Sequence, residues 1–226
     1  MTDVLEAEGV ALYLGADYEA AEPIHAKVAA ERAEFHGSKL SMIGLSWANQ
    51  GDTRLALGDL KGAELLIQRA VAHFDATLPA GHTLRCAALD VQGSVASRRG
   101  DLPAARAALE KSLALRPLSE PSGRAASLEL LALALLRAGL IVEAEGRLAE
   151  AEKLRREVNS EGVDAALTQR LRGYVRSAQG RFGDARQELS VANEVLVGAL
   201  GRKHPETLRA ARALGEAELE LGQTEV

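Results

Sequence analysis

The chain contains very few cysteine and aromatic residues. Cys86 is the only cysteine in 226 residues, so an intrachain disulfide is excluded. Free cysteine is among the most buried residue types, and Cys86 is therefore expected to be a packing residue. Phenylalanine, tryptophan and tyrosine together make up 3% of the chain, whereas alanine and leucine are abundant. Because strands favour aromatic and β-branched residues and helices favour alanine and leucine, the composition predicts closely packed helices.

Long apolar segments and an excess of positive charge are also lacking. The longest purely apolar run, Leu130–Leu136, is far too short to cross a bilayer. The chain does not open with a basic stretch followed by an apolar one, as a secretion signal would. The formal net charge of −5 argues against a nucleic-acid-binding domain, which normally carries a basic face. We expect a soluble cytoplasmic protein, or a cytoplasmic fragment of a longer one, without membrane or nucleic-acid partners.

The sequence shows none of the residue groups that carry catalysis or hold a metal ion. No two of the five histidines lie three or four residues apart, and zinc sites need clustered ligands at such spacings. A phosphate-binding loop of the form G-x-x-x-x-G-K-[ST] is missing. The many carboxylates fall in helical patterns, where charged residues usually form a solvated face. We therefore expect no catalytic residues, no metal and no cofactor.

An internal repeat organises the chain. Turns after a first helix are predicted at steps of 42, 42, 39, 41 and 42 residues, at Ala16, Gly58, Gly100, Gly139, Gly180 and Gly222. Seven residues before each turn stands another small residue: Gly9, Gly51, Gly93, Ala132, Gly173 and Gly215. Five residues after each of the earlier turns stands an alanine: Ala21, Ala63, Ala105, Ala144 and Ala185. Agreement of these registers at one period predicts a repeat protein.

The small residues have different expected roles within each repeat. A glycine in mid-helix costs about 1 kcal/mol relative to alanine, so its return at one register indicates a packing requirement. We expect this glycine and the alanine twelve residues later to form the two faces of a close helix crossing. The turn glycine suits a left-handed cap at the end of the first helix. Asp59 and Asp101, which follow Gly58 and Gly100, are predicted to cap the second helix.

Each repeat is predicted to consist of two helices joined by a tight turn. First helices are expected near residues 3–15, 40–57, 84–99, 123–138, 163–179 and 206–221. Second helices are expected near 17–35, 60–77, 102–116, 141–158 and 182–200. The predicted fold is an all-α solenoid of five helix pairs plus a capping helix, without strands. We expect one domain, 1–226, with repeats at 1–36, 37–80, 81–121, 122–161 and 162–203, a capping helix at 204–226, and a bend near Pro117–Gly123.

Several stretches resemble the tetratricopeptide repeat (TPR) family. Trp47-x-x-Gln50-Gly51 is similar to the family's W-x-x-L-G core, with glutamine in the leucine position, and Leu89-x-x-Gln92-Gly93 repeats that variant. The usual period is about 34 residues. The longer period here, and the similarity of Leu200–Thr207 to an L-G-x-x-H-P-x-T join, resemble the repeats of kinesin light chain. The resemblance covers essentially the whole chain and implies a right-handed superhelix that binds proteins or peptides.

The resemblance also implies a concave groove lined by first-helix residues. The residues implied to contact an extended peptide or helix are Asp52, Asp90, Ser94, Arg98, Glu129, Arg137, Arg170, Tyr174, Arg209 and Arg212. The same register exposes Asp3, Glu6, Glu216 and Glu220. Carboxylates predominate among these residues in the first repeats and arginines in the last repeats. The groove is therefore expected to hold the acidic part of a charge-polarised peptide near the arginines of the last repeats. A solvated face without a partner is the alternative.

Gln50 and Gln92 occupy equivalent positions beside a neighbouring helix. One interpretation is a hydrogen bond between helices that recurs in both repeats. The other is a ladder of amides that grips the backbone of a bound peptide.

We interpret the chain as a non-enzymatic protein–protein interaction scaffold. A peptide-responsive sensor or regulatory module of a larger signalling protein is the alternative, and an enzyme of unrecognised type is least favoured. The first helix has little polar face, so a partner, a preceding segment or a second copy of the chain is expected to cover it. The apolar residues in question are Val4, Leu5, Val10, Leu12 and Leu14.

Overall fold

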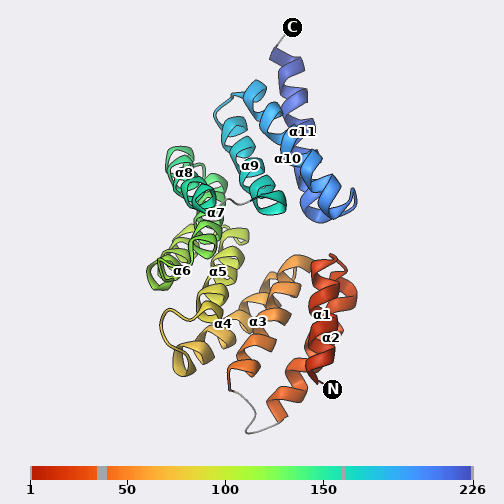
Figure 1. Cartoon of the computed structure of the whole chain (residues 1–226), viewed down its shortest axis with the longest axis vertical. Helices are drawn as coiled ribbons and strands as arrows, with labels where there is room; N and C mark the ends of the chain where they lie inside the picture. The colour runs from red at the N-terminus through yellow and green to blue at the C-terminus, as the bar shows by residue number, and fades with distance from the viewer. Residues whose placement is uncertain (1, 35–39, 159–160, 225–226) are drawn as a thin grey trace. The chain divides into compact units, whose positions relative to one another are not determined.

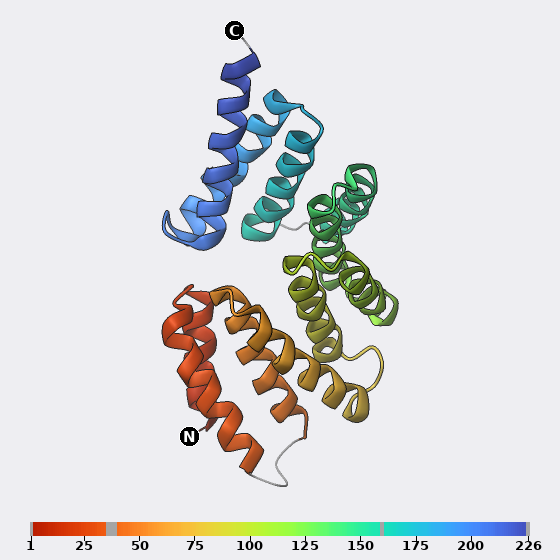
Figure 2. The same ribbon diagram turned by 180° about the vertical axis from the view of Figure 1, so that it is seen from behind.

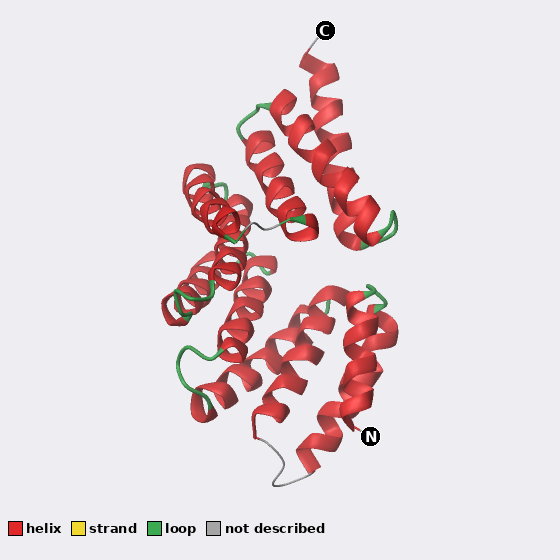
Figure 3. Ribbon diagram, in the orientation of Figure 1, coloured by secondary structure: helices red, strands yellow, loops and turns green. Residues whose placement is uncertain are grey.

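Helices are the only regular secondary structure in the residues that the structure describes (Figures 1 and 3). The computed structural model describes residues 2–34, 40–158 and 161–224, and no strand occurs in these ranges. The first helices there are α1 (Thr2–Leu14), α3 (Leu40–Leu57), α5 (Thr83–Arg98), α7 (Pro121–Arg137), α9 (Gly162–Ala178) and α11 (Pro205–Thr224). The second helices there are α2 (Tyr18–Glu34), α4 (Leu60–Thr77), α6 (Leu102–Leu115), α8 (Ile141–Glu157) and α10 (Phe182–Leu200). The prediction of an all-α protein built from helix pairs is confirmed.

The chain divides into two compact parts, Met1–Pro117 and Leu118–Val226, which we call the N-terminal half and the C-terminal half. Within each half, every helix packs against the next helix along the chain, as views from opposite sides show (Figures 1 and 2). The division falls in the stretch Pro117–Gly123, where a bend is predicted, although α7 already begins at Pro121. The single domain and the bend both remain predictions.

The turn between first and second helix follows the predicted chemistry. Gly58 has φ +88° and Gly100 has φ +79°, a left-handed conformation that is easiest without a Cβ. The carboxylate of Asp59 accepts a hydrogen bond from the backbone N–H of Gly62 at 2.9 Å and so caps α4. Asp101 caps α6 in the same way. These local signals place the helix ends, and the largest difference between predicted and observed bounds is three residues, at Thr224.

The last repeat departs from the prediction at two glycines. The predicted turn at Gly222 is wrong, because α11 continues through this residue to Thr224. The register also predicts that Gly215 is a close-packed mid-helix residue, whereas it is exposed and nothing lies within 4 Å of an added Cβ. In the part of the chain that the structure describes, no second helix packs on this face of α11, so nothing there requires a small residue.

The mid-helix glycines make room for one large side chain of the second helix. A Cβ added to Gly93 would lie 2.5 Å from Leu109 Cγ, and one added to Gly173 would lie 2.5 Å from Leu189 Cγ. These leucines follow the glycine by sixteen residues rather than by twelve. Ala105, at the predicted crossing, is fully buried, but the atoms nearest to the glycine belong to the leucine. The predicted pairing of glycine with alanine is corrected accordingly.

Replacing Gly93 by leucine is expected to destabilise the protein by about 1–3 kcal/mol or more, because the new side chain collides with Leu109 in a filled interior. Ala105→Leu should have a similar effect, since Ala105 is 0% exposed. The exposed Glu110 is the control, and its replacement by leucine should change the free energy of unfolding by less than about 0.5 kcal/mol. Urea unfolding followed by circular dichroism measures all three variants. Equal effects at the three positions would refute the register.

Each half has its own apolar interior. In the N-terminal half Ile67, Phe74 and Leu89 are at most 1% exposed and belong to one cluster. In the C-terminal half Leu189 and Leu196 are 0% exposed and pack beneath α11. Such residues supply most of the stabilisation, because burying a leucine contributes roughly 1.5–3 kcal/mol.

The exposure of three apolar side chains bears on the expectations from the sequence. Cys86 is fully buried, as expected of a packing residue. On α1, Val4 is 72% exposed and Leu14 is 69% exposed. Their covering by a partner or by a second copy of the chain stays a prediction.

Candidate functional site

A buried pair of arginine and carboxylate recurs within the helix pairs. In each pair the carboxylate stands three residues before the mid-helix small residue of the first helix. The arginine stands in the second helix, eleven residues after the alanine of the same repeat. The pairs are Glu6–Arg32 (2.5 Å), Asp90–Arg116 (2.6 Å) and Glu129–Arg155 (2.9 Å). Their side chains are only 5–15% exposed. Because a buried charge is tolerated only when it is paired, these residues hold the helices of a repeat together.

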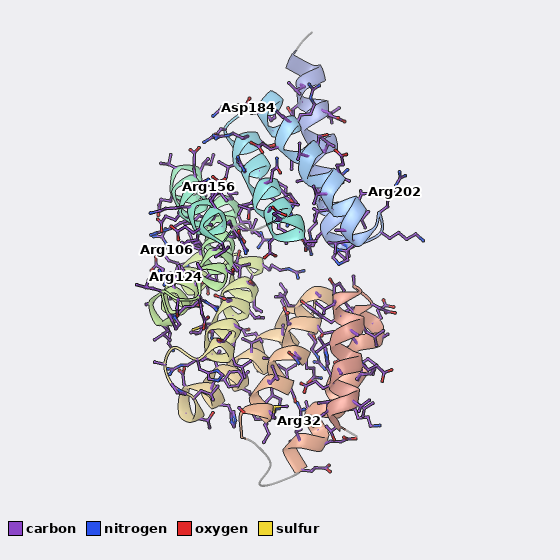
Figure 4. All side chains as sticks on the ribbon, viewed as in Figure 1. Arg32, Arg106, Arg124, Arg156, Asp184 and Arg202 are labelled. Carbon is purple, nitrogen blue, oxygen red and sulfur yellow. The ribbon has the colours of Figure 1, made fainter. Side chains whose placement is uncertain are left out.

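Two of the pairs also reach the first helix of the following repeat through a hydroxyl group. Thr168 of α9 donates to Oε1 of Glu129 at 2.6 Å, the same oxygen that accepts from Arg155 Nε at 3.0 Å. In the N-terminal half, Nη1 of Arg32 donates to Oγ of Ser46 in α3 at 2.8 Å (Figure 4 labels Arg32). Ser46 and Thr168 occupy the same position in their repeats. Each of these groups, which we call a clamp, therefore ties three helices together.

The three buried ion pairs remove three carboxylates from the implied groove. The register predicts that Glu6, Asp90 and Glu129 are exposed, whereas their side chains are 12%, 12% and 15% exposed and bonded to arginine. The expectation of exposure is wrong because it considered only positions along the first helices. The arginine that covers each carboxylate comes from the second helix of the same repeat. Asp3 differs, since its side chain is 87% exposed although it lies 2.9 Å from Arg32 Nη2.

The other implied residues of the N-terminal half also have internal partners. The half-buried Asp52 accepts a hydrogen bond from the Tyr13 hydroxyl at 2.6 Å, and burial raises the pKa of its carboxyl. The Ser94 hydroxyl donates to a backbone carbonyl one turn earlier in α5, at 2.9 Å. Arg98 donates to the backbone carbonyl of Leu55. Of these three, only Arg98 is exposed.

In the C-terminal half the structure brings four implied residues together on α9 and α11. They are Arg170, Tyr174, Arg209 and Arg212, and we call them the arginine–tyrosine cluster. The guanidinium carbon of Arg170 lies 5.6 Å from the centre of the Tyr174 ring, within cation–π range. The Tyr174 hydroxyl lies 3.5 Å from the backbone carbonyl oxygen of Arg209. The side chains of Arg209 and Arg212 are 55% and 82% exposed.

Carboxylates of α11 already occupy this cluster. The carboxylate of Glu206 forms ion pairs with both Arg170 and Arg209. Glu216 pairs with Arg212 at 2.8 Å. Glu206 is not among the implied groove residues, because it lies in the first turn of the helix and outside the implied register. Its two ion pairs show that the spacing of the arginines fits a carboxylate.

The charge states in the cluster follow from burial and from these partners. Burial raises the pKa of the Tyr174 hydroxyl; the positive charge of Arg170 lowers this pKa, and the negative charge of Glu206 raises it. The phenol is therefore neutral and able to donate a hydrogen bond at neutral pH. The hydrogen bond to Glu216 raises the pKa of Arg212, which stays charged. The cluster therefore presents charged guanidinium groups beside a neutral hydroxyl that can donate a hydrogen bond.

Two implied residues lie outside the cluster. Arg137 is exposed in the last turn of α7, and Glu220 is exposed near the end of α11. The structure does not bring them together with the arginines of α9 and α11.

Gln50 and Gln92 differ although their positions are equivalent. Nε2 of Gln50 donates to Oε1 of Glu22 at 3.2 Å, which is the expected bond between helices. Among the described residues Gln92 has no side-chain hydrogen bond, and it lines a cavity. The two amides therefore do not form a repeated bond.

Within the described ranges, no three histidine, cysteine, aspartate or glutamate side chains lie close enough to hold a metal ion. A search of the same residues for a helix with the length and hydropathy of a membrane span found none.

Comparison with solved structures shows the kind of fold. A kinesin light chain-like protein of Podosopora anserina with nearly identical TPR-like repeats aligns at a TM-score of 0.61 and 23% identity, over 83% of this chain and 90% of the other. BtubC (BKLC) from P. vanneervenii aligns at a TM-score of 0.68 and 13% identity, over 89% of this chain and 81% of the other. No family model and no curated protein matches the sequence. The chain thus has a TPR-like α-solenoid fold similar to that of kinesin light chain-like repeats.

Proposed function

We propose that this chain is a non-enzymatic, cytoplasmic scaffold that binds an acidic segment of a partner protein at the arginine–tyrosine cluster. The observation that carries the proposal is the convergence of three arginines and a tyrosine from two neighbouring first helices. A carboxylate fits the planar guanidinium fork with two parallel hydrogen bonds. A tyrosine beside it supplies both an apolar face and a hydroxyl donor.

The carboxylates of α11 mark where those of a partner would bind. Glu216 and Arg212 form an exposed pair, with side chains 61% and 82% exposed. An exposed ion pair contributes little, because water and salt screen it, so a partner carboxylate can replace Glu216 at little cost. Glu206 is less exposed, at 24%, and is expected to stay in place and orient Arg170 and Arg209.

The bound segment is proposed to be an extended peptide or a helix that follows the first helices. A single TPR-like domain over residues 1–226 is part of the same proposal. The TPR-like fold supports the proposal, because repeats of this kind present extended binding surfaces.

Reversing the charge of the cluster tests the proposal. Arg209→Glu combined with Arg212→Glu is expected to weaken binding of the native partner, captured from lysate, by tenfold or more, about 1.4 kcal/mol. It should also reduce the dependence of affinity on salt, because fewer ion pairs form. The fold should survive, since both arginines are exposed and each reversal only places like charges one turn apart on the surface of α11.

The matched control reverses two exposed arginines of the same half, Arg181 and Arg186. Isothermal titration calorimetry of the full chain at two salt concentrations compares the variants. Equal losses in both double variants would indicate nonspecific attraction. An unchanged affinity for Arg209→Glu/Arg212→Glu would show that the assignment of the cluster is wrong.

A further inference from the structure

The N-terminal half contains a cavity between α4, α5 and α6 that the clamps and the implied groove do not use. Its volume is about 350 Å³, within the range of small ligand pockets. Ile67, Val95 and several alanines provide most of its wall. Glu64 and Gln92 are among its few polar residues. Gln68 and Lys111 also line the cavity, and Lys111 is paired with Asp75 at 3.1 Å. The wall is therefore mainly apolar, with one carboxylate and two amides available for orientation.

The preceding repeat shows what fills the equivalent space. Positions there are 42 residues earlier, so Glu22 corresponds to Glu64 and Gln50 to Gln92. Both Gln50 Nε2, at 3.2 Å, and Arg54 Nε, at 3.0 Å, donate to Oε1 of Glu22. The half-buried side chain of Leu66 lies beside Gly51 in the same interface. An arginine, a leucine and a bonded amide thus occupy the equivalent positions in the preceding repeat.

The cavity arises because two of these side chains are replaced by alanine. Ala96 stands where the preceding repeat has Arg54, and Ala108 stands where it has Leu66. Glu64 keeps one partner, Arg99, which approaches from the end of α5. Gln92 has no side-chain hydrogen bond among the described residues.

A third repeat also places an arginine on this carboxylate. Between α8 and α9, Glu145 is the equivalent of Glu64, and Arg176 is the equivalent of Ala96. Arg176 Nη1 donates to Oε1 of Glu145 at 2.8 Å. In these two repeats the arginine at this position places its guanidinium on the carboxylate. In the repeat with the cavity the position is Ala96, and the one guanidinium on Glu64 comes from Arg99.

We propose that the cavity binds a partner peptide that presents a leucine-sized aliphatic side chain next to an arginine or lysine. The aliphatic side chain takes the space that Leu66 fills in the preceding repeat. The cation binds Glu64 as Arg54 binds Glu22, and the amide of Gln92 hydrogen-bonds the peptide backbone. This site lies in the N-terminal half and requires a basic ligand, so it does not depend on the acidic partner proposed for the other half.

Filling the cavity with the side chains of the preceding repeat provides the test. The variant Ala96→Arg/Ala108→Leu should fold and should lose the cavity, because the same residues are accommodated one repeat earlier. Its helical circular dichroism and urea midpoint should equal or exceed those of the wild type. If the double variant does not fold, Ala108→Leu alone serves as the filled protein.

Selection from a random peptide library on the wild-type chain, after depletion on the filled variant, identifies the ligand. We expect the enriched peptides to combine leucine or isoleucine with a nearby arginine or lysine. Calorimetry should show at least about tenfold weaker binding to the filled variant, as for the loss of one buried anchor. Glu64→Gln should weaken the binding of the selected basic peptides. It should not weaken the binding of analogues in which the arginine or lysine is replaced by a neutral residue.

Ala114→Leu, at an exposed position on α6, is the matched control and should bind the selected peptides like the wild type. Peptides that bind the wild type and the filled variant equally would overturn the proposal. So would the absence of any enriched peptide, or enriched sequences without an aliphatic or a basic residue.

Discussion

Arg155→Ala is expected to destabilise the protein by about 3–5 kcal/mol, the usual effect of removing one partner of a buried ion pair. The side chain of Glu129 is only 15% exposed and accepts hydrogen bonds from Arg155 at 3.0 and 2.9 Å. Without the arginine this carboxylate keeps only the Thr168 hydroxyl, at 2.6 Å. Its negative charge would then be buried without a countercharge. Urea unfolding followed by circular dichroism measures the loss.

Arg156 is the matched control for this prediction. It is the next residue of α8 and its side chain is 71% exposed, with Glu152 4.0 Å away (Figure 4). Arg156→Ala should therefore change the free energy of unfolding by no more than about 0.5 kcal/mol. Replacing both Glu129 and Arg155 by leucine and methionine should recover much of the stability, because no buried charge remains. A loss no larger for Arg155→Ala than for Arg156→Ala would contradict the clamp.

Deleting α11 is expected to have the second largest effect. Leu189 and Leu196 are 0% exposed and pack against Ala217 and Ala210 of this helix. A chain ending at His204 exposes both leucines, at an expected loss of roughly 3–6 kcal/mol from their burial. Terminal helices of repeat arrays also keep the array soluble, so the truncated protein should self-associate. Size-exclusion chromatography and thermal unfolding report the two effects.

A shorter truncation separates packing from chain length. A chain ending at Leu221 retains Ala210 and Ala217 and should behave like the full chain. If the chain ending at His204 stayed monomeric with an unchanged melting midpoint, α11 would not be the cap of the C-terminal half.

The helices could be predicted from the sequence because their ends depend on local residues. A turn glycine, a capping aspartate and a recurring alanine act within a few residues of one another, as Gly58, Asp59 and Ala63 do. Gly222 misled the prediction, because glycine is tolerated inside a helix when nothing requires a left-handed turn. The crossing partner of Gly93 was also misplaced, since the shape of Leu109 decides it rather than the smallest nearby residue.

The candidate site could be predicted only in part. The register correctly placed Tyr174, Arg209 and Arg212 on neighbouring first helices. It failed at Glu129, whose exposure depends on an arginine of the second helix, 26 residues away. That arginine recurs eleven residues after the repeat's alanine, so the signal was present in the sequence. Nothing in the sequence alone showed that Glu206 would share its carboxylate between two arginines.

Hydrogen–deuterium exchange of the full chain, with and without the partner captured from lysate, tests the proposed function most directly. An acidic segment on the arginine–tyrosine cluster should slow exchange in α9 around Arg170–Tyr174 and in α11 around Arg209–Arg212. The Arg209→Glu/Arg212→Glu variant should lose this protection at the same partner concentration. Protection confined to other helices, or protection in α9 and α11 that persists in the variant, would contradict the account.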